Sequence, residues 1–438
     1  MSKRLLAVFL VLVMILSLTA CGGEEEEQTS KRRRKDNETE TTGEVTEVAD
    51  KTKPGKEEKP ERGKGYKSPY TEFEEMDDTV IIDDEYVTVT LGKPIVEDWY
   101  LEFDLEVVNK SDRSLAVYTE HTAVNGKMTQ DGAYAAVEPN ETASEKGHIY
   151  DFTDFDDVTR FSMAVQIYDT FEYDLDKFYY IDIFPHGKDA YEPEKAPKEL
   201  DSLVEAEELY AATTDFYVDD FGDYRTDGVI GNYSDELVRF THNIVTVNGF
   251  GMNSMMYGYV LPGTFAETTN YLDMEYLKAL GIKDVTGLEV DCAFEDMDYD
   301  TIVENTVTVY PEGKSNYEEF LFEFDDECII AVEEKDFSMA LTNITYDEVY
   351  GFKIYFVLKN ETGKVLSFNG TNLVVNGKKL EYNGMYNSCY RPVDTFGVIS
   401  IYEPETLGID EIESVQMDLE ILDEDYDAVF EETVTFAF

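Results

Sequence analysis

Hydrophobic and polar residues alternate in three stretches of the chain, residues 157–169, 284–296 and 411–423. In each stretch every second residue is apolar: Phe161, Met163, Val165 and Ile167, then Leu288, Val290, Cys292 and Phe294, then Val415, Met417, Leu419 and Ile421. A period of two is typical of a β-strand with one buried face, as in an antiparallel sheet. Each stretch therefore predicts a half-buried strand, which an acidic turn joins to a final strand.

A second pattern recurs upstream of those strands with the same spacing. Residues 109–126, 232–249 and 360–377 share one frame: Asn, then Ser or Thr two positions later, an apolar strand, and a closing Val-Asn-Gly. The Asn-x-Ser/Thr element predicts a turn whose side chains bond the local backbone, and Asn-Gly between alternating stretches predicts a hairpin. A spacing of about 125 residues is the length of a small domain.

The two patterns together predict three homologous domains, at residues 76–188, 200–313 and 322–438. Roughly seven short strands per ~110 residues, with turn signals between them, are typical of an immunoglobulin-like β-sandwich. We therefore expect an all-β fold of three tandem antiparallel sandwiches. The second domain is partly degenerate, because residues 224–230 alternate but carry little apolar weight, and a short helix is expected near residues 271–280.

The first 21 residues predict a secretory signal. Lys3 and Arg4 precede an apolar run at residues 5–18, which is short for a spanning helix and suits a signal peptide. The segment that follows the signal, residues 22–75, is rich in charge, Pro and Gly and nearly free of aromatic residues. Such a composition predicts a disordered tether.

The signal ends in a four-residue box that resembles the lipobox of bacterial lipoproteins: Leu18, Thr19, Ala20 and Cys21. The resemblance implies lipidation of the Cys21 thiol, cleavage before Cys21, and a mature chain anchored by lipid at the outer face of the cytoplasmic membrane. Several acyl chains on one residue make a stable anchor, because each buried CH₂ contributes roughly 0.8 kcal/mol.

The charge of the chain is strongly uneven. The whole chain carries −59, residues 1–70 contribute +1, and residues 71–438 therefore carry −60. Such a surface repels phosphate backbones, so we expect no nucleic-acid partner. The basic run at residues 31–35 is interpreted as part of a solvated tether, with contact to the anionic membrane face as the alternative.

Acidic turns recur after two of the alternating strands. Their carboxylates are candidate calcium ligands: Asp296, Asp298 and Asp300 in the second domain, and Asp423, Asp425 and Asp427 in the third. Oxygen ligands at alternate positions of a turn suit Ca²⁺, but the Gly and Glu that complete an EF-hand loop are absent. A weak Ca²⁺ site is therefore one hypothesis, and a solvated hairpin turn is the other.

No catalytic constellation is evident in the sequence, and we expect a protein that is not an enzyme. The four His residues show no metal spacing, and no Gly-x-Ser-x-Gly, Cys-x-x-Cys or phosphate-binding loop occurs. With 95 carboxylates, an acid–base pair stays an open alternative. Among the cysteines, Cys292 is expected in a core, and a Cys328–Cys389 disulfide is a further possibility.

The chain resembles predicted Gram-positive surface lipoproteins that carry tandem immunoglobulin-like domains and have no assigned activity. The lipobox, the tether and the three repeats carry this resemblance, which implies architecture and an extracellular location. The predicted function is a lipid-anchored binding, adhesion or spacer module with a cell-wall, glycan or protein ligand. The alternatives are a solute-binding lipoprotein of a transporter, which normally needs two α/β lobes, and a carboxylate-dependent hydrolase.

Overall fold

The structure is a computed structural model of the 438-residue chain. It describes residues 70–74, 78–97, 100–129, 132–150, 157–171, 175–347, 351–380, 384–387, 389–402 and 404–437. The predicted signal, the lipobox with Cys21 and residues 22–69 lie outside the described residues. Every described residue belongs to one compact unit, residues 64–438.

Strands dominate the structure. About 60% of it is β-strand and about 4% is helix, so the predicted all-β fold is confirmed. The helices of the described residues are α2 (Met274–Ala279), α3 (Pro404–Leu407) and two 3₁₀ turns at Lys188–Ala190 and Lys314–Asn316. No helix in this part of the chain has the length and apolar character needed to cross a bilayer.

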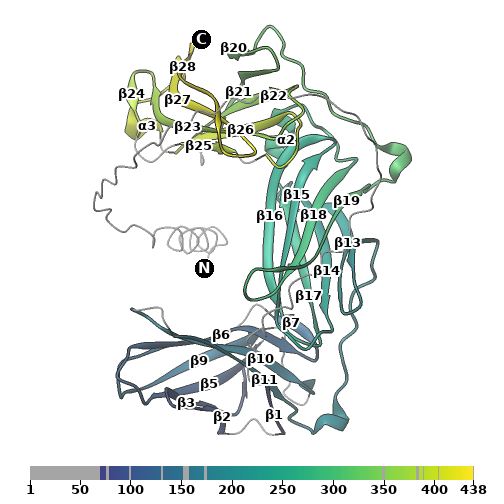
Figure 1. The fold of residues 1–438 in the computed structure, drawn as a ribbon, viewed down its shortest axis with the longest axis vertical. Coiled ribbons are helices and arrows are strands. Elements are labelled where there is room, and N and C mark those ends of the chain that lie inside the picture. Colours follow the sequence, from purple (N-terminus) through teal and green to yellow (C-terminus); the bar gives the residue numbers. More distant parts are fainter. Residues whose placement is uncertain are drawn as a thin grey trace, which may run out of the picture. The chain divides into compact units, whose positions relative to one another are not determined.

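The first repeat forms two facing sheets (Figure 1). Its strands are β1 (Tyr70–Phe73), β2 (Thr79–Asp83), β3 (Val87–Leu91), β4 (Ile95–Val96), β5 (Tyr100–Asn109), β6 (Leu115–Val124), β7 (Lys127–Thr129), β8 (Tyr134–Val137), β9 (Thr142–Tyr150), β10 (Phe161–Asp169) and β11 (Asp176–Ile183). One sheet has the order β2-β3-β5, with β4 and β9 also pairing β5. The other has the order β1-β11-β10-β6, with β7 and β8 pairing β6.

The second repeat has the same strand order. Its strands are β12 (Asp201–Glu205), β13 (Leu209–Val218), β14 (Tyr224–Asn232), β15 (Val238–Val247), β16 (Phe250–Val260), β17 (Thr264–Leu272), β18 (Leu288–Glu295) and β19 (Thr301–Val309). The order β12-β13-β14-β17 faces β16-β15-β18-β19. The weakly apolar stretch at residues 224–230 therefore still forms its strand, β14, and the expected helix is α2, capped by the Asp273 carboxylate.

The third repeat repeats this order once more. Its strands are β20 (Ile329–Glu333), β21 (Phe337–Asp347), β22 (Gly351–Asn360), β23 (Leu366–Val375), β24 (Lys378–Lys379), β25 (Met385–Asn387), β26 (Thr395–Ile401), β27 (Ser414–Asp423) and β28 (Ala428–Ala437). In every repeat the strand after the Asn-x-Ser/Thr turn crosses to the other sheet, as in an immunoglobulin-like sandwich. The number of independently folding domains stays a prediction.

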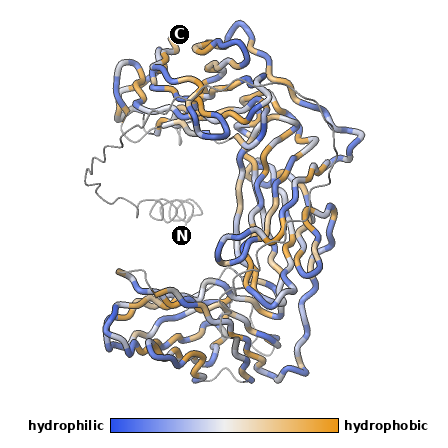
Figure 2. The backbone as a smooth tube through the Cα atoms, viewed as in Figure 1, coloured by the Kyte–Doolittle hydropathy of each residue, from blue (hydrophilic) through white to orange (hydrophobic). Residues whose placement is uncertain are grey.

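The alternating positions named from the sequence all lie in the core. Each of the twelve residues in the three stretches is at most 2% exposed. They belong to three hydrophobic clusters, one centred on each repeat. Figure 2 shows hydrophobic segments of the chain recurring within the strands. Because a fully buried large apolar side chain contributes roughly 1.5–3 kcal/mol, these clusters supply most of the favourable free energy of folding.

The predicted boundary between the tether and the first repeat needs a correction. Strand β1 (Tyr70–Phe73) lies inside the predicted tether of residues 22–75, and it pairs in parallel with β11. Four residues are too few to show an alternating pattern, and the neighbouring sequence is charged. The predicted tether therefore cannot include residues 70–73.

Candidate functional site: the repeat junctions

The first Asn of each repeated frame fastens the turn between the two sheets. Asn109 Nδ2 donates to the Arg113 carbonyl at 2.7 Å, and its Oδ1 accepts hydrogen bonds from the amide and hydroxyl of Ser111. The same set recurs at Asn232 with Glu236 and Ser234, and at Asn360 with Lys364 and Thr362. The motif is thus a structural turn, as its residue types predicted.

The second Asn of the frame, in Val-Asn-Gly, holds the hairpin against the next strand of its own sheet. Asn248 has a φ of 52°, and its Oδ1 accepts the amides of Thr286 and Gly287 at 2.8 and 2.9 Å. Its Nδ2 donates to the Asp284 carbonyl at 2.7 Å. Asn125 and Asn376, at φ 51° and 50°, make corresponding bonds.

The Val-Asn-Gly turn of the first repeat also contacts the second repeat. Lys127 of β7 pairs in parallel with Phe265 of β17, and the Phe265 amide donates to the Gly126 carbonyl at 2.8 Å. The Lys127 ammonium lies 2.9 Å from a Glu267 carboxylate oxygen. This pairing joins one sheet of each repeat into a single ten-stranded sheet.

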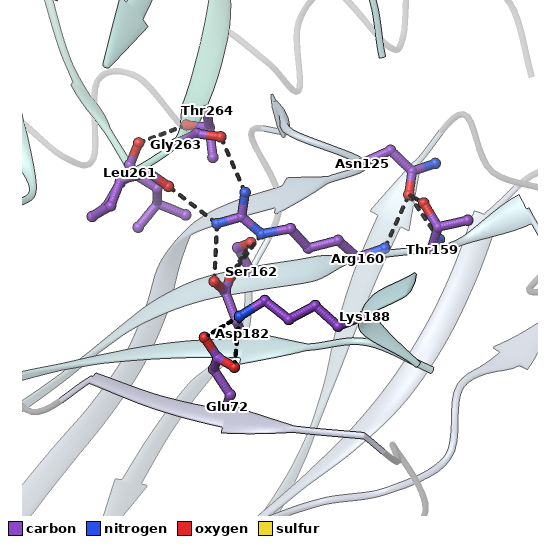
Figure 3. Close-up of polar contacts among 11 residues, drawn as sticks. Glu72, Asn125, Thr159, Arg160, Ser162, Asp182, Lys188, Leu261, Gly263 and Thr264 are labelled. Atoms are coloured by element: carbon purple, nitrogen blue, oxygen red, sulfur yellow. Dashed lines mark hydrogen bonds and ion pairs between the residues drawn. The ribbon is translucent and has the colours of Figure 1, made fainter. Parts of the chain in front are cut away.

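The Arg160 side chain bonds to both repeats at this junction (Figure 3). Its Nε and Nη2 each lie 3.0 Å from an Asp182 oxygen, and its Nη1 and Nη2 donate to the Gly263 and Pro262 carbonyls at 3.0 and 3.1 Å. Arg160 is 8% exposed. Burial lowers its pKa, but the charge and hydrogen bonds of Asp182 outweigh burial and raise the pKa above its ordinary value. The buried guanidinium therefore stays charged and paired.

The second junction is built in the same way. Gly251 of β16 pairs in parallel with Thr395 of β26, and the Gly251 amide donates to the Asp394 carbonyl at 2.7 Å. The result is an eight-stranded sheet shared by the second and third repeats. An arginine again spans the junction: Arg391 of the third repeat donates to Glu289 of β18 at 2.5 Å and also to Asp291.

Aromatic packing adds to the second junction. The Phe250 ring, directly after the turn, lies 5.7 Å from Phe320 and 6.2 Å from Phe396 between ring centroids. Beside them, the Lys353 ammonium of β22 lies 2.8 Å from a Glu275 oxygen of α2. This junction therefore combines a backbone pair, ion pairs and an apolar contact.

The six candidate calcium ligands lie in the turns β18–β19 and β27–β28. The Asp296 carboxylate accepts the amides of Asp298 and Asp300, both at 2.9 Å, and Asp423 does the same for Asp425 and Asp427 at 3.1 Å. The first Asp of each motif is thus a backbone acceptor that shapes a hairpin turn. Within the described ranges, no group of three His, Cys, Asp or Glu side chains is placed to hold a metal ion.

The remaining candidate residues are dispersed. Cys292 is buried with its pKa raised by burial to about 12, and Cys328 and Cys389 are free, so the possible disulfide between them is not formed. Cys389 is buried beside Gly251 at the second junction, whereas Cys328 precedes β20. His242 lies inside the second repeat, while His148 stacks near Tyr150 on the first.

Large aromatic side chains lie both in the core and at the surface, and two exposed ones lie together on the second repeat. Tyr257 and Tyr299 are each 64% exposed, and the Arg239 guanidinium lies between their rings at 5.4 and 5.1 Å. Glu295 holds Arg239 at 2.7 Å. On the third repeat a groove of about 510 Å³ crosses β23, β27 and β28; its lining includes Asn369, Thr371, Asp418, Glu420, Glu431 and Thr433.

No family model matches this chain, and no curated protein matches it. Among solved structures, a red sea bream transglutaminase matches 53% of this chain and 32% of its own chain, at 12% identity and a TM-score of 0.16. An exo-chitosanase of Amycolatopsis orientalis matches 53% of this chain and 26% of its own, at 10% identity and a TM-score of 0.16. The chain is thus similar to less than a third of either protein, and likenesses this slight carry no functional argument.

Proposed function

We propose that this chain is a lipid-anchored extracellular surface protein in which three immunoglobulin-like repeats act as a spacer that presents an acidic surface. The anchor part rests on the lipobox that ends in Cys21. The spacer part rests on one observation: at both junctions a sheet of one repeat continues in parallel pairing into the next. Hydrogen-bonded junctions restrict the movement of one repeat against the next more than flexible linkers would. Such restriction suits a spacer.

Two features support this reading against the alternatives. A two-lobed solute-binding protein is normally built from strands alternating with helices, whereas the strands within each sandwich here pair mainly antiparallel. The residues with the most distinctive sequence signal, Asn109 and Asn125 with their counterparts, are occupied in backbone bonds within their own repeat. Their repetition is therefore explained by folding, without a reaction.

Amide hydrogen exchange tests the spacer part. If the junctions stay formed, the amides of Phe265 and Gly251 exchange at least about 100-fold more slowly than unstructured amides, because opening a stable unit costs free energy. Exchange at the rate of an open loop at both positions contradicts the proposal.

Two matched variants localise the effect. Arg160→Met should speed exchange of the Phe265 amide by about tenfold or more and leave exchange of the Gly251 amide unchanged. The reason is that Arg160 donates hydrogen bonds at the first junction and not at the second. Arg391→Met should do the reverse. Uniform acceleration at both amides by either variant would indicate global loosening instead of junction-specific clamps.

A further inference from the structure

The two junctions use the same register. At the first junction Lys127, one residue after the turn glycine Gly126, pairs with Phe265. At the second junction Gly251, two residues after the turn glycine Gly249, pairs with Thr395. Phe265 faces Gly231, one residue before the motif Asn232, and Thr395 faces Leu358, two residues before Asn360. Moving one residue towards the C-terminus on both paired strands of the first junction therefore gives the pair seen at the second junction.

Among the described residues, the third repeat has an unpaired copy of one half of this junction and the first repeat has an unpaired copy of the other half. The donor half is the third Val-Asn-Gly turn with β24, Asn376–Lys379, where Lys378 and Lys379 are exposed. The acceptor half is the start of β9 in the first repeat. Thr142 faces Val108, one residue before the motif Asn109, so Thr142 occupies the position of Phe265.

The backbone directions at both halves suit pairing. The Glu141 carbonyl accepts the Asn109 amide and thus faces β5. Because successive residues of a strand direct their amide and carbonyl to opposite edges, Thr142 directs both groups to the free edge of β9. Lys379 faces Val374 in the same relation that Gly251 bears to Thr246 at the second junction. Its amide therefore points away from β23.

The charges of the two halves are complementary. At the first junction Lys127 forms its ion pair diagonally with Glu267, two positions beyond the residue it faces. In the third turn the position of Lys127 belongs to Lys378, whose ammonium donates to the Leu407 and Gly408 carbonyls of its own repeat. The next lysine, Lys379, faces Ala143 in the same register and lies diagonal to Glu141 and Glu145, both exposed. In a region that carries −60, an exposed pair of lysines at this turn is a local exception.

We propose that a second copy of this chain fills the unused halves: the Asn376–Lys379 turn of one copy pairs in parallel with the start of β9 in another. The Thr142 amide donates to the Gly377 carbonyl, as Phe265 does to Gly126. The Lys379 amide donates to the Thr142 carbonyl, as Gly251 does to Asp394. Lys379 pairs with Glu141 or Glu145 across the contact.

This association is weaker than the internal junctions. Within the chain, linker residues also pack on the turn: the Tyr191 hydroxyl lies against Gly126, and Tyr317 and Glu319 lie against Gly249. A contact between copies lacks that segment and buries little area, which places it among weak, transient interfaces. Confinement on a membrane raises the effective concentration of the copies and so favours such a contact.

Disulfide trapping between two differently labelled chains tests the register. The full-length lipidated protein in vesicles carries Cys328→Ser in every sample, because Cys328 is the partly exposed native thiol. One chain carries Lys378→Cys and the other Thr142→Cys, positions that face each other in the proposed pair with Cα atoms near 5 Å apart, within disulfide range. We expect a mixed dimer at least about tenfold more abundant than with the control pair Lys335→Cys and Thr142→Cys, since Lys335 is 89% exposed and remote in the register.

A charge exchange supplies a second, independent readout. Lys379→Glu in the Lys378→Cys chain should lower the trapped dimer about fivefold or more, and Glu145→Lys in the Thr142→Cys chain should restore it. Equal trapping of the test and control pairs, or no dimer at all, overturns the proposal. So does a dimer that ignores both charge changes. None of these outcomes touches the spacer proposal, whose readouts at Phe265 and Gly251 lie within one chain.

Discussion

Asn270 fixes the tautomer of the buried His242. Asn270 Oδ1 accepts hydrogen bonds from the Ser254 hydroxyl and the Tyr271 amide, so its Nδ2 is the group that meets His242 Nδ1 at 3.2 Å. Nδ1 must therefore accept, and the imidazole proton resides on Nε2. Among the residues that the structure describes, none is a hydrogen-bond partner of His242 Nε2, and His242 lines a small cavity with Thr226. Protonating Nδ1 would place two donors face to face.

The first prediction is that acid destabilises the second repeat through His242. Burial lowers its pKa from 6.5 to about 4. A depressed histidine pKa means that the unfolded chain binds the proton more tightly, so stability is complete above pH 6.5 and is lost as the pH falls towards 4. The loss at pH 4 is about 3 kcal/mol. Urea unfolding from pH 7.5 to 4.5 should show this component in the wild type and lack it in His242→Gln. Parallel pH profiles for the two proteins would contradict the assignment.

The second prediction compares two ion pairs shown together in Figure 3. Arg160→Met leaves the Asp182 carboxylate buried without its cation, which should cost about 3–5 kcal/mol of unfolding free energy. Lys188→Met is the matched control, because Lys188 and Glu72 are 62% and 40% exposed. That change should cost at most about 0.5 kcal/mol. Chemical denaturation measures both, and similar losses for the two variants would refute the role given to burial.

The third prediction separates backbone strain from hydrogen bonding at the Val-Asn-Gly turn. Asn248→Gly keeps the left-handed conformation but loses bonds to Thr286, Gly287 and Asp284, at a cost of about 2–3 kcal/mol. Asn248→Ala loses the same bonds and adds about 1 kcal/mol, because φ 52° is unfavourable for a residue with a Cβ. Thermal unfolding should rank the wild type, the Gly variant and the Ala variant in that order. An Ala variant as stable as the Gly variant would show that strain plays no part.

The fourth prediction concerns the acidic turn of the third repeat. Asp423→Ala should cost about 1–2 kcal/mol, because the amides of Asp425 and Asp427 lose their acceptor. Asp425→Asn should be neutral without metal. The calcium hypothesis stays a prediction: it requires that low-millimolar CaCl₂ raise the Tm beyond NaCl of equal ionic strength. Asp425→Asn with Asp427→Asn should remove that excess, and equal shifts in the two salts would refute the site.

The fifth prediction concerns attachment to the membrane. Cys21→Ala should release the protein from the membrane, or leave it held by an uncleaved signal, because the thiol that accepts the lipid is gone. Cell fractionation with mass measurement of the N-terminus distinguishes these forms. A cleaved Cys21→Ala chain that remains in the membrane fraction would require another anchor.

Local periodicity and turn chemistry were sufficient to predict the strands and the Asn turns. Burial of one sheet face imposes a period of two on the sequence. The alternating stretches that contain Phe161, Leu288 and Val415 therefore predicted buried strands. The bonds of Asn109 to Arg113 and Ser111 span only a few residues, so residue type alone indicated them.

The junction contacts left no comparable trace in the sequence. Arg160 donates to carbonyls about a hundred residues away, and Arg391 reaches Glu289 over a similar separation. A backbone carbonyl accepts hydrogen bonds whatever its side chain, so Pro262 and Gly263 carry no mark of their partner. The repeated frame predicted three units but gave no sign that their turns join them.

The parallel pair between β1 and β11 has a mechanical consequence. Strand β1 is the first described strand of the first repeat, and β11 is its last strand. The two strands pair over four residues. A force that pulls on the N-terminal end of β1 and on the C-terminal end of β11 acts along the two strands in opposite directions. The interstrand hydrogen bonds are then loaded in shear and must yield together, whereas a hairpin pulled from its open end unzips one bond at a time.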